Sequence, residues 1–283
     1  MLVEQRARRD AFLEKIGSRP LTMGILNLTP DSFSDGGRFV AAEAALSHAA
    51  DMEAAGCDII DVGGESTRPG AVPVTEAEEL SRIETIFARL ALRLGIPLSI
   101  DTYKASVAAR ALELGAILVN DVWGLQKDPM MADTVAAGEA AVVIMHNRTD
   151  KDATLDILAE IRRFFARSLE LADIAGIPRS RIILDPGIAF GKTARQNVEV
   201  IARLGELADF GCPIMVGLSR KTFLGSLVEG GIEGQLVGTV AANLVAAMHG
   251  ASLFRVHDVA AHVRAFKVLD TICAGANLES IRR

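Results

Sequence analysis

The stretch AAVVIMH, residues 140–146, decides the fold. Six apolar residues precede His146 with no polar interruption, and Gly138 stands just ahead of them. Strands that are buried on both faces have this pattern, as in a parallel sheet covered by helices. The stretch therefore predicts a central parallel strand.

Seven similar Val- and Ile-rich runs occupy residues 21–27, 58–64, 98–101, 117–121, 181–187, 213–219 and 252–258. Between the runs lie stretches whose apolar residues recur every three or four positions, as on amphipathic helices, at 40–54, 76–94, 104–114, 155–175 and 198–208. Strands alternating with helices predict βαβ units. Eight such units favour a single-domain TIM (β/α)₈ barrel over a doubly wound open sheet, because closure removes the sheet edges.

Six glycines mark expected helix ends just before strands, where a left-handed residue belongs: Gly56, Gly95, Gly115, Gly138, Gly176 and Gly250. No linker or second domain interrupts the pattern. We expect residues 1–18 to form a charged, helical lead-in and residues 19–283 to form the barrel.

The composition indicates a globular protein, with 50% apolar and 23% charged residues and a net charge of −6 in 283 residues. Lys and Arg are scattered, which argues against a nucleic-acid surface and means that an anionic ligand needs a few placed cations. Three separated cysteines without a CxxC argue against disulfides and zinc. The charged start is no signal peptide and no apolar run could span a bilayer, so we expect a cytoplasmic protein without a membrane partner.

Polar residues stand where each predicted strand ends, and active sites of TIM barrels lie at that end. We expect them to converge on one pocket for a polar, flat, anionic ligand; they are Asn27, Glu65, Asp101, Asn120, Asp121, His146, Asp185, Ser219, Arg220, Lys221, Arg255 and His257. Two long loops after strands, 28–38 and 63–70, contain Phe, Asp and Arg among turn residues. We expect both loops to act as lids.

These residues belong to motifs that resemble the dihydropteroate synthase family. The motifs, in family order, are MGILNLTPDSFSDGG (23–37), DIIDVGGESTRPGA (58–71), SIDTYK (99–104), NDVWG (120–124), LDPGIAFGKT (184–193), GLSRKTFLG (217–225) and FRVHDV (254–259). They extend over residues 20–272. The resemblance implies an enzyme of folate synthesis that condenses 7,8-dihydropterin-6-ylmethyl diphosphate with p-aminobenzoate, on the barrel already predicted.

The resemblance also implies site residues. For the pterin they are Asp101, Asn120, Asp185 and Lys221, and Met145 is a further substrate-binding residue. A carboxylate such as Asp185 suits this ring, because it accepts hydrogen bonds from adjacent N–H donors. For the diphosphate they are Arg68, Arg255 and His257, with Mg²⁺ bound through Asn27. For p-aminobenzoate they are Phe33, Thr67, Pro69, Phe190, Lys221 and Thr222.

A homodimer is implied as well, although the sequence does not show which helices pair. The implied mechanism is ionisation, in which diphosphate departs and the pterin carries a positive charge. We expect Asp35, Lys221, Arg255 and His257 to be the catalytic residues, with Asp35 acting beside the developing cation only after its loop closes.

Two other functions remain open. Corrinoid-linked methyltetrahydrofolate methyltransferases share the barrel and pterin pocket but lack the SFSDGG and STRPG loops found here. A pterin-binding paralogue without synthesis is the non-enzyme alternative. Three departures from the family pattern favour it, namely Ala189 in place of Gly, the loop MHNRTD at 145–150, and Gln235 in place of Arg. GIAFGKT has three residues where a P-loop needs four, which argues against a nucleotide site.

Overall fold

The computed structural model describes residues 1–28, 37–65 and 72–273. Eight parallel strands form a closed barrel in which each strand pairs with the next along the chain and β8 pairs with β1. The strands are β1 (Leu21–Asn27), β2 (Ile59–Gly63), β3 (Leu98–Asp101), β4 (Leu118–Asp121), β5 (Ala141–Met145), β6 (Ile182–Asp185), β7 (Ile214–Val216) and β8 (Ala251–Val256). The predicted TIM barrel is confirmed.

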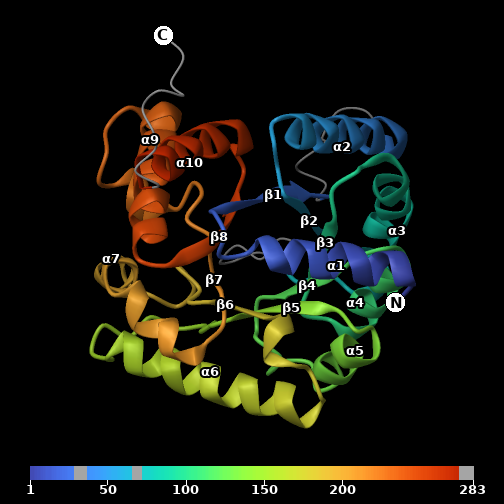
Figure 1. The fold of residues 1–283 in the computed structure, drawn as a ribbon, viewed down its shortest axis with the longest axis horizontal. Helices are drawn as coiled ribbons and strands as arrows, with labels where there is room; N and C mark the ends of the chain where they lie inside the picture. Colours follow the sequence, from blue (N-terminus) through green and yellow to red (C-terminus); the bar gives the residue numbers. More distant parts are fainter. Residues whose placement is uncertain (29–36, 66–71, 274–283) are drawn as a thin grey trace.

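Helices surround the barrel and cover its outer face (Figure 1). They are α1 (Val3–Lys15), α2 (Gly37–Ala54), α3 (Glu76–Arg93), α4 (Ala105–Glu113), α5 (Met131–Ala137), α6 (Ile157–Ile174), α7 (Ala194–Ala202), α8 (Thr222–Gly225), α9 (Gly231–Met248) and α10 (Val259–Cys273), with 3₁₀ helices at Arg179–Arg181 and Leu204–Phe210. Within the described part of the chain, no helix is both long and apolar enough to cross a membrane.

Local sequence signals explain where helices start. Thr75 accepts a hydrogen bond from the backbone N–H of Glu78, whose carboxylate accepts one from the N–H of Thr75 in return, and this capping box starts α3. Asp156 caps α6 through the N–H of Ala159. The predicted helix at 198–208 is wrong in extent, because α7 ends at Ala202 and a 3₁₀ helix follows.

The core has two layers. The larger cluster lies between the strands and the surrounding helices and includes Phe87 and Phe165. The smaller cluster fills the barrel interior with residues such as Met23, Leu118 and Ile183. Phe12 of α1 belongs to this inner cluster and is 3% exposed. Helix α1 thus lies across one end of the barrel and covers its apolar filling (Figure 1).

Four of the six predicted left-handed glycines have positive φ angles, namely Gly56, Gly115, Gly176 and Gly250. Gly95 and Gly138 do not. A Cβ on Gly138 would lie 2.6 Å from Cδ1 of Leu112, and one on Gly95 would lie 3.2 Å from Oε1 of Glu53. These two glycines therefore allow close packing. The left-handed conformation predicted for Gly138 is adopted instead by the next residue, Glu139, with φ 51°.

Candidate active site

Strand register brings the carboxyl ends of β1 to β4 to one level. Asn27 pairs with Gly63, Gly63 with Asp101, and Asp101 with Asn120. Farther around the barrel, Met145 pairs with Asp185. Because inward-facing residues alternate along a strand, the predicted residues meet above the apolar filling at the end of the barrel opposite α1.

Arg255 links two buried carboxylates across the barrel. Its Nε donates to Oδ2 of Asp61 at 2.7 Å, and its Nη2 donates to Oδ2 of Asp101 at 2.7 Å. Asn120 also donates to Oδ2 of Asp61, through Nδ2 at 2.9 Å. Strands β2, β3, β4 and β8 are thus joined by one polar network, which we call the Arg255 network: Asp61, Asp101, Asn120 and Arg255.

Asp61 was not identified as a site residue from the sequence, although its position in an apolar strand indicated one. It is 0% exposed and stands within the apolar strand β2, where an unpaired charge would be costly. A buried carboxylate in such a strand requires a cation or several donors. Sequence alone gave no means of finding its partner, since Arg255 lies 194 positions away.

Three oxygens of the Arg255 network accept no hydrogen bond from any residue that the structure describes. They are Oδ1 of Asp61, Oδ1 of Asp101 and Oδ1 of Asn120, and all are buried. Buried acceptors normally have donors, so these atoms indicate what a ligand would supply. The cluster suits a flat ring that presents several N–H groups.

Burial sets the charge state of the carboxyls. It raises the pKa of Asp101, and the guanidinium of Arg255 opposes this shift. Burial also raises the pKa of Asp185 to about 6, although the N–H of Gly187 and the charge of Lys221 favour the ionised form. Desolvated groups of this kind are typical of functional sites.

Asp185 and Lys221 lie at the ends of β6 and β7. Oδ1 of Asp185 accepts a hydrogen bond from the N–H of Gly187 at 2.7 Å. The ammonium of Lys221 lies 4.6 Å from the centroid of the half-buried Phe190 ring, within cation–π range. Lys221 thus lies beside an aromatic wall and close enough to Asp185 to lower its pKa.

Other predicted residues lie at the same end of the barrel. His257 follows β8, and its Nδ1 lies 3.0 Å from Oγ of Ser219. Thr222 opens α8 and is exposed, whereas Met145 is 4% exposed. Phe33, Asp35, Thr67, Arg68 and Pro69, with most of the two predicted lids, lie outside the described residues.

Four of the polar strand-end residues have structural partners instead of joining the cluster. Glu65 pairs with Lys104, which also donates to Glu79 at 2.6 Å. Asp121 accepts the N–H groups of Trp123 and Leu125 in its own turn. His146 contacts Lys192, and Arg220 pairs with Asp258 at 2.9 Å. These four residues are therefore held by partners outside the Arg255 network, and the expectation that they line the same pocket stays a prediction: Glu65, Asp121, His146 and Arg220.

The surroundings of Asn27 fit a magnesium ion held mainly by substrate oxygens. A Cβ on Gly63 would lie 3.6 Å from Oδ1 of Asn27 and 3.6 Å from Oδ2 of Asp101, so the glycine keeps space beside these oxygens. Among the described residues, no group of three His, Cys, Asp or Glu could hold a metal. Mg²⁺ accepts such a sparse set, because it retains waters and binds phosphate.

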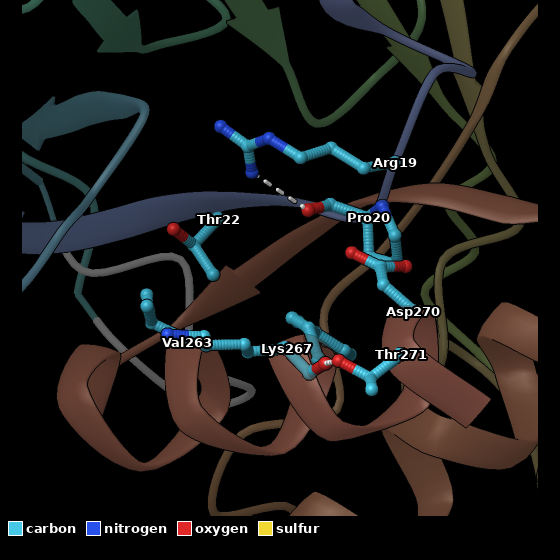
Figure 2. A pocket seen from close by; sticks show the side chains of 8 residues that line it. Arg19, Pro20, Thr22, Val263, Lys267, Asp270 and Thr271 are labelled. Carbon is cyan, nitrogen blue, oxygen red and sulfur yellow. Dashed lines mark hydrogen bonds between the residues drawn. The ribbon is translucent and has the colours of Figure 1, made fainter. Parts of the chain in front are cut away.

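Two cavities lie at the other end of the barrel. The first, of about 240 Å³, lies between the start of β1 and the last turns of α10 (Figure 2). Its Arg19 already donates to Asp58 and to the carbonyl of Pro20. The second, of about 320 Å³, shares Arg19, Pro20 and Asp270 with it. Neither cavity includes a residue of the Arg255 network.

A closed parallel barrel with buried carboxylates, an amide and cations at the carboxyl ends of its strands defines a TIM-barrel enzyme that binds a nitrogen-rich ring. The model of the pterin binding enzyme family matches residues 23–257, and the chain belongs to this family.

Dihydropteroate synthase of Clostridium beijerinckii is 45% identical over 91% of this chain and 96% of its own length. The structure of a Clostridium difficile dihydropteroate synthase with pteroic acid has a TM-score of 0.88 and 47% identity, and covers 91% of this chain and 98% of that one. A Xanthomonas albilineans dihydropteroate synthase with 4-aminobenzoic acid has a TM-score of 0.86 and 44% identity, with 90% and 94% covered.

Proposed function

We propose that this chain has dihydropteroate synthase activity, joining 7,8-dihydropterin-6-ylmethyl diphosphate to p-aminobenzoate. The observation that carries the proposal is the set of three unpartnered buried oxygens in the Arg255 network. A pterin presents adjacent N–H donors that match such acceptors. The similar synthases, with pteroic acid in one structure and 4-aminobenzoic acid in another, support the same substrates.

In this proposal the pterin ring binds Asp101, Asn120, Asp185 and Lys221, and Met145 forms part of its apolar wall. Each hydrogen bond to a charged group contributes about 1.5–3 kcal/mol, which suffices to orient the ring. p-Aminobenzoate lies farther out, against Phe190 and Thr222, with Phe33, Thr67 and Pro69 of the two loops around it. Lys221 lies beside the Phe190 ring and so serves both substrates.

The leaving diphosphate is bound by Arg255 and His257, with Arg68 from the second loop. Two carboxylates engage Nε and Nη2 of Arg255, so its Nη1 is the group that we assign to phosphate. Asn27 would hold Mg²⁺, which when bound neutralises diphosphate charge and so improves the leaving group.

The reaction proceeds by ionisation. The bond between the pterin CH₂ and the diphosphate oxygen breaks, and its electron pair leaves with diphosphate. The conjugated ring then carries positive charge until the amine lone pair forms the new C–N bond and the amine loses a proton. Asp101 and Asp185 surround the ring with preorganised negative charge that stabilises this cation. Asp35 would add a further carboxylate when its loop closes.

The test is a direct assay with the purified chain, both substrates and Mg²⁺, in which dihydropteroate and diphosphate should form in equal amounts. Chelation by EDTA should stop turnover, and added Mg²⁺ should restore it. Tight binding of the pterin diphosphate with no product would instead identify a paralogue without synthesis. Asp35→Asn should lower kcat strongly while changing pterin binding little, because its contact forms mainly in the transition state.

We further propose a cytoplasmic homodimer that pairs through α9. Apolar residues are exposed along this helix, with Val237 at 65%, Val245 at 43% and Met248 at 71%. Val198 of the neighbouring α7 is 48% exposed and extends the apolar surface. Light scattering should give twice the chain mass, and Val245→Glu should give the monomer; an unchanged mass for the variant would exclude this interface. Free cysteines at 57, 212 and 273 accord with a reducing compartment.

A further inference from the structure

Lys192 is a buried lysine that has no role in the proposed reaction. It lies at the end of the segment between β6 and α7 and is 1% exposed. Its Nζ lies 2.7 Å from Nδ1 of His146, 2.7 Å from the carbonyl oxygen of Gly187 and 3.2 Å from that of Phe190. Such complete burial of a lysine requires polar partners, and here there are three.

The three partners match the three N–H groups of an ammonium ion. A neutral amine has two N–H groups and would satisfy all three partners only if Nδ1 of His146 donated to its lone pair. His146 is suited to accept, because burial lowers its pKa to about 2 and keeps its ring neutral. Burial also lowers the pKa of Lys192 to about 7, whereas the negative charge of Asp185 favours the charged form.

The loop around Lys192 is tightly wound. Gly187, Ala189 and Gly191 have φ angles of 66°, 71° and 57°, so the chain reverses repeatedly around the ammonium. A Cβ on Gly187 would overlap the carbonyl oxygen of His146 and lie 3.4 Å from Nζ of Lys192. The same loop starts at Asp185 and carries Phe190, whose ring lies under Lys221.

Charged groups from several elements surround Lys192. Asp185 of β6 and Glu160 of α6 favour its charge, whereas Arg148, after β5, and Lys221, after β7, oppose it. Burial raises the pKa of Asp185, and three nearby cations oppose this shift by favouring the ionised carboxylate: Lys221, Lys192 and Arg255. Lys192 is the one of these cations that lies beneath the loop rather than among the residues proposed to bind substrate.

We propose that Lys192 is a positioning residue for pterin binding, whose buried ammonium holds the β6–α7 loop closed and helps to keep Asp185 ionised. The proposal rests on the assignment of Asp185 to the pterin. Lys192 would act in two ways, by holding the loop in place through hydrogen bonds and by stabilising the charge of Asp185. A second residue of the chain supports the loop alone and so provides a control for the first effect. Asn197 of α7 anchors the same loop without charge, since its Oδ1 accepts the N–H of Ala189 at 2.7 Å.

The test measures the affinity for 6-hydroxymethylpterin between pH 5 and pH 8.5. In the wild type, binding should weaken below a midpoint set by Asp185. Lys192→Met should move this midpoint upward by about one pH unit, as removal of a nearby opposite charge does. Asn197→Ala should weaken binding at every pH and leave the midpoint in place. Equal midpoints for Lys192→Met and the wild type would overturn the proposal.

A second measurement needs neither a variant nor a ligand. The ¹⁵N chemical shift of Nζ in the full-length wild-type protein should show an ammonium ion at pH 6, below the pKa of about 7, and a neutral amine there would overturn the proposal even where Lys192→Met does not fold. The proposal of synthase activity is contradicted by a different result, the absence of dihydropteroate formation by the wild type. The two failures are therefore distinguishable.

Discussion

Ala189 donates its backbone N–H to Oδ1 of Asn197 at 2.7 Å while its own backbone has a left-handed φ of 71°. This is the position where the family usually has glycine, and the structure gives the reason. A side chain in this region of φ costs about 1–2 kcal/mol, which glycine avoids. The hydrogen bond to Asn197 holds the alanine in this conformation despite the strain.

Ala189→Gly should therefore stabilise the protein. Part of the relieved strain is offset by the greater freedom of glycine in the unfolded chain, so we expect a net gain of about 0.5–1 kcal/mol. Urea denaturation would measure it. Ala166→Gly is the matched control, because Ala166 is exposed in the middle of α6, where glycine should cost about 1 kcal/mol. Destabilisation by both substitutions would contradict the argument.

Asp61→Asn should weaken pterin binding about 10- to 100-fold. The carboxylate of Asp61 holds both Arg255 and Asn120, and each hydrogen bond to a charged group is worth about 1.5–3 kcal/mol. Ser99→Ala serves as the control, since Ser99 pairs with Asp61 across β2 and β3 and its buried hydroxyl has no partner within the described part of the chain. Calorimetric titration with 6-hydroxymethylpterin should separate the two variants; similar affinities would show that Asp61 does not organise the site.

The pH dependence of pterin binding and of stability should have opposite signs. With a pKa of about 6 in the folded protein and 3.8 as its ordinary value, Asp185 binds more protons in the folded state between these values. The free energy of unfolding should then fall by about 1–3 kcal/mol as the pH rises from 4 to 6.

Pterin binding needs the ionised carboxylate and should weaken about tenfold per pH unit below 6. In Asp185→Asn both dependences should flatten, and affinity should be low throughout. Parallel denaturation and binding measurements across this range check both signs. A wild-type affinity that is constant from pH 5 to pH 7 would exclude Asp185 as the carboxylate that binds the ring.

The barrel could be predicted because its signal is local. The strands at 21–27 and 98–101 have the predicted bounds, since short runs containing Leu and Ile between helical stretches fit buried parallel strands. The proximity of Asp101, Asn120 and Arg255 could be predicted as well, because the carboxyl ends of the strands converge in a closed barrel. The partners of a side chain are not local, however, so Asp61 and Lys192 were overlooked. Gly138 was misinterpreted for the same reason, because its contact with Leu112 of another helix is a tertiary one.

We propose that helix α1 stabilises the barrel without taking part in its chemistry. Phe12 is 3% exposed against the apolar filling, at the end of the barrel opposite the Arg255 network. Phe12→Ala should lower the free energy of unfolding by about 3–5 kcal/mol, the usual cost of removing a buried aromatic ring. Val3→Ala in the same helix should change it by less than about 0.5 kcal/mol, because Val3 is 82% exposed. Because the site is remote, pterin affinity at low temperature should be equal in both variants and the wild type. A loss of affinity in Phe12→Ala that exceeds the loss of folded protein would show that α1 contributes to the site itself.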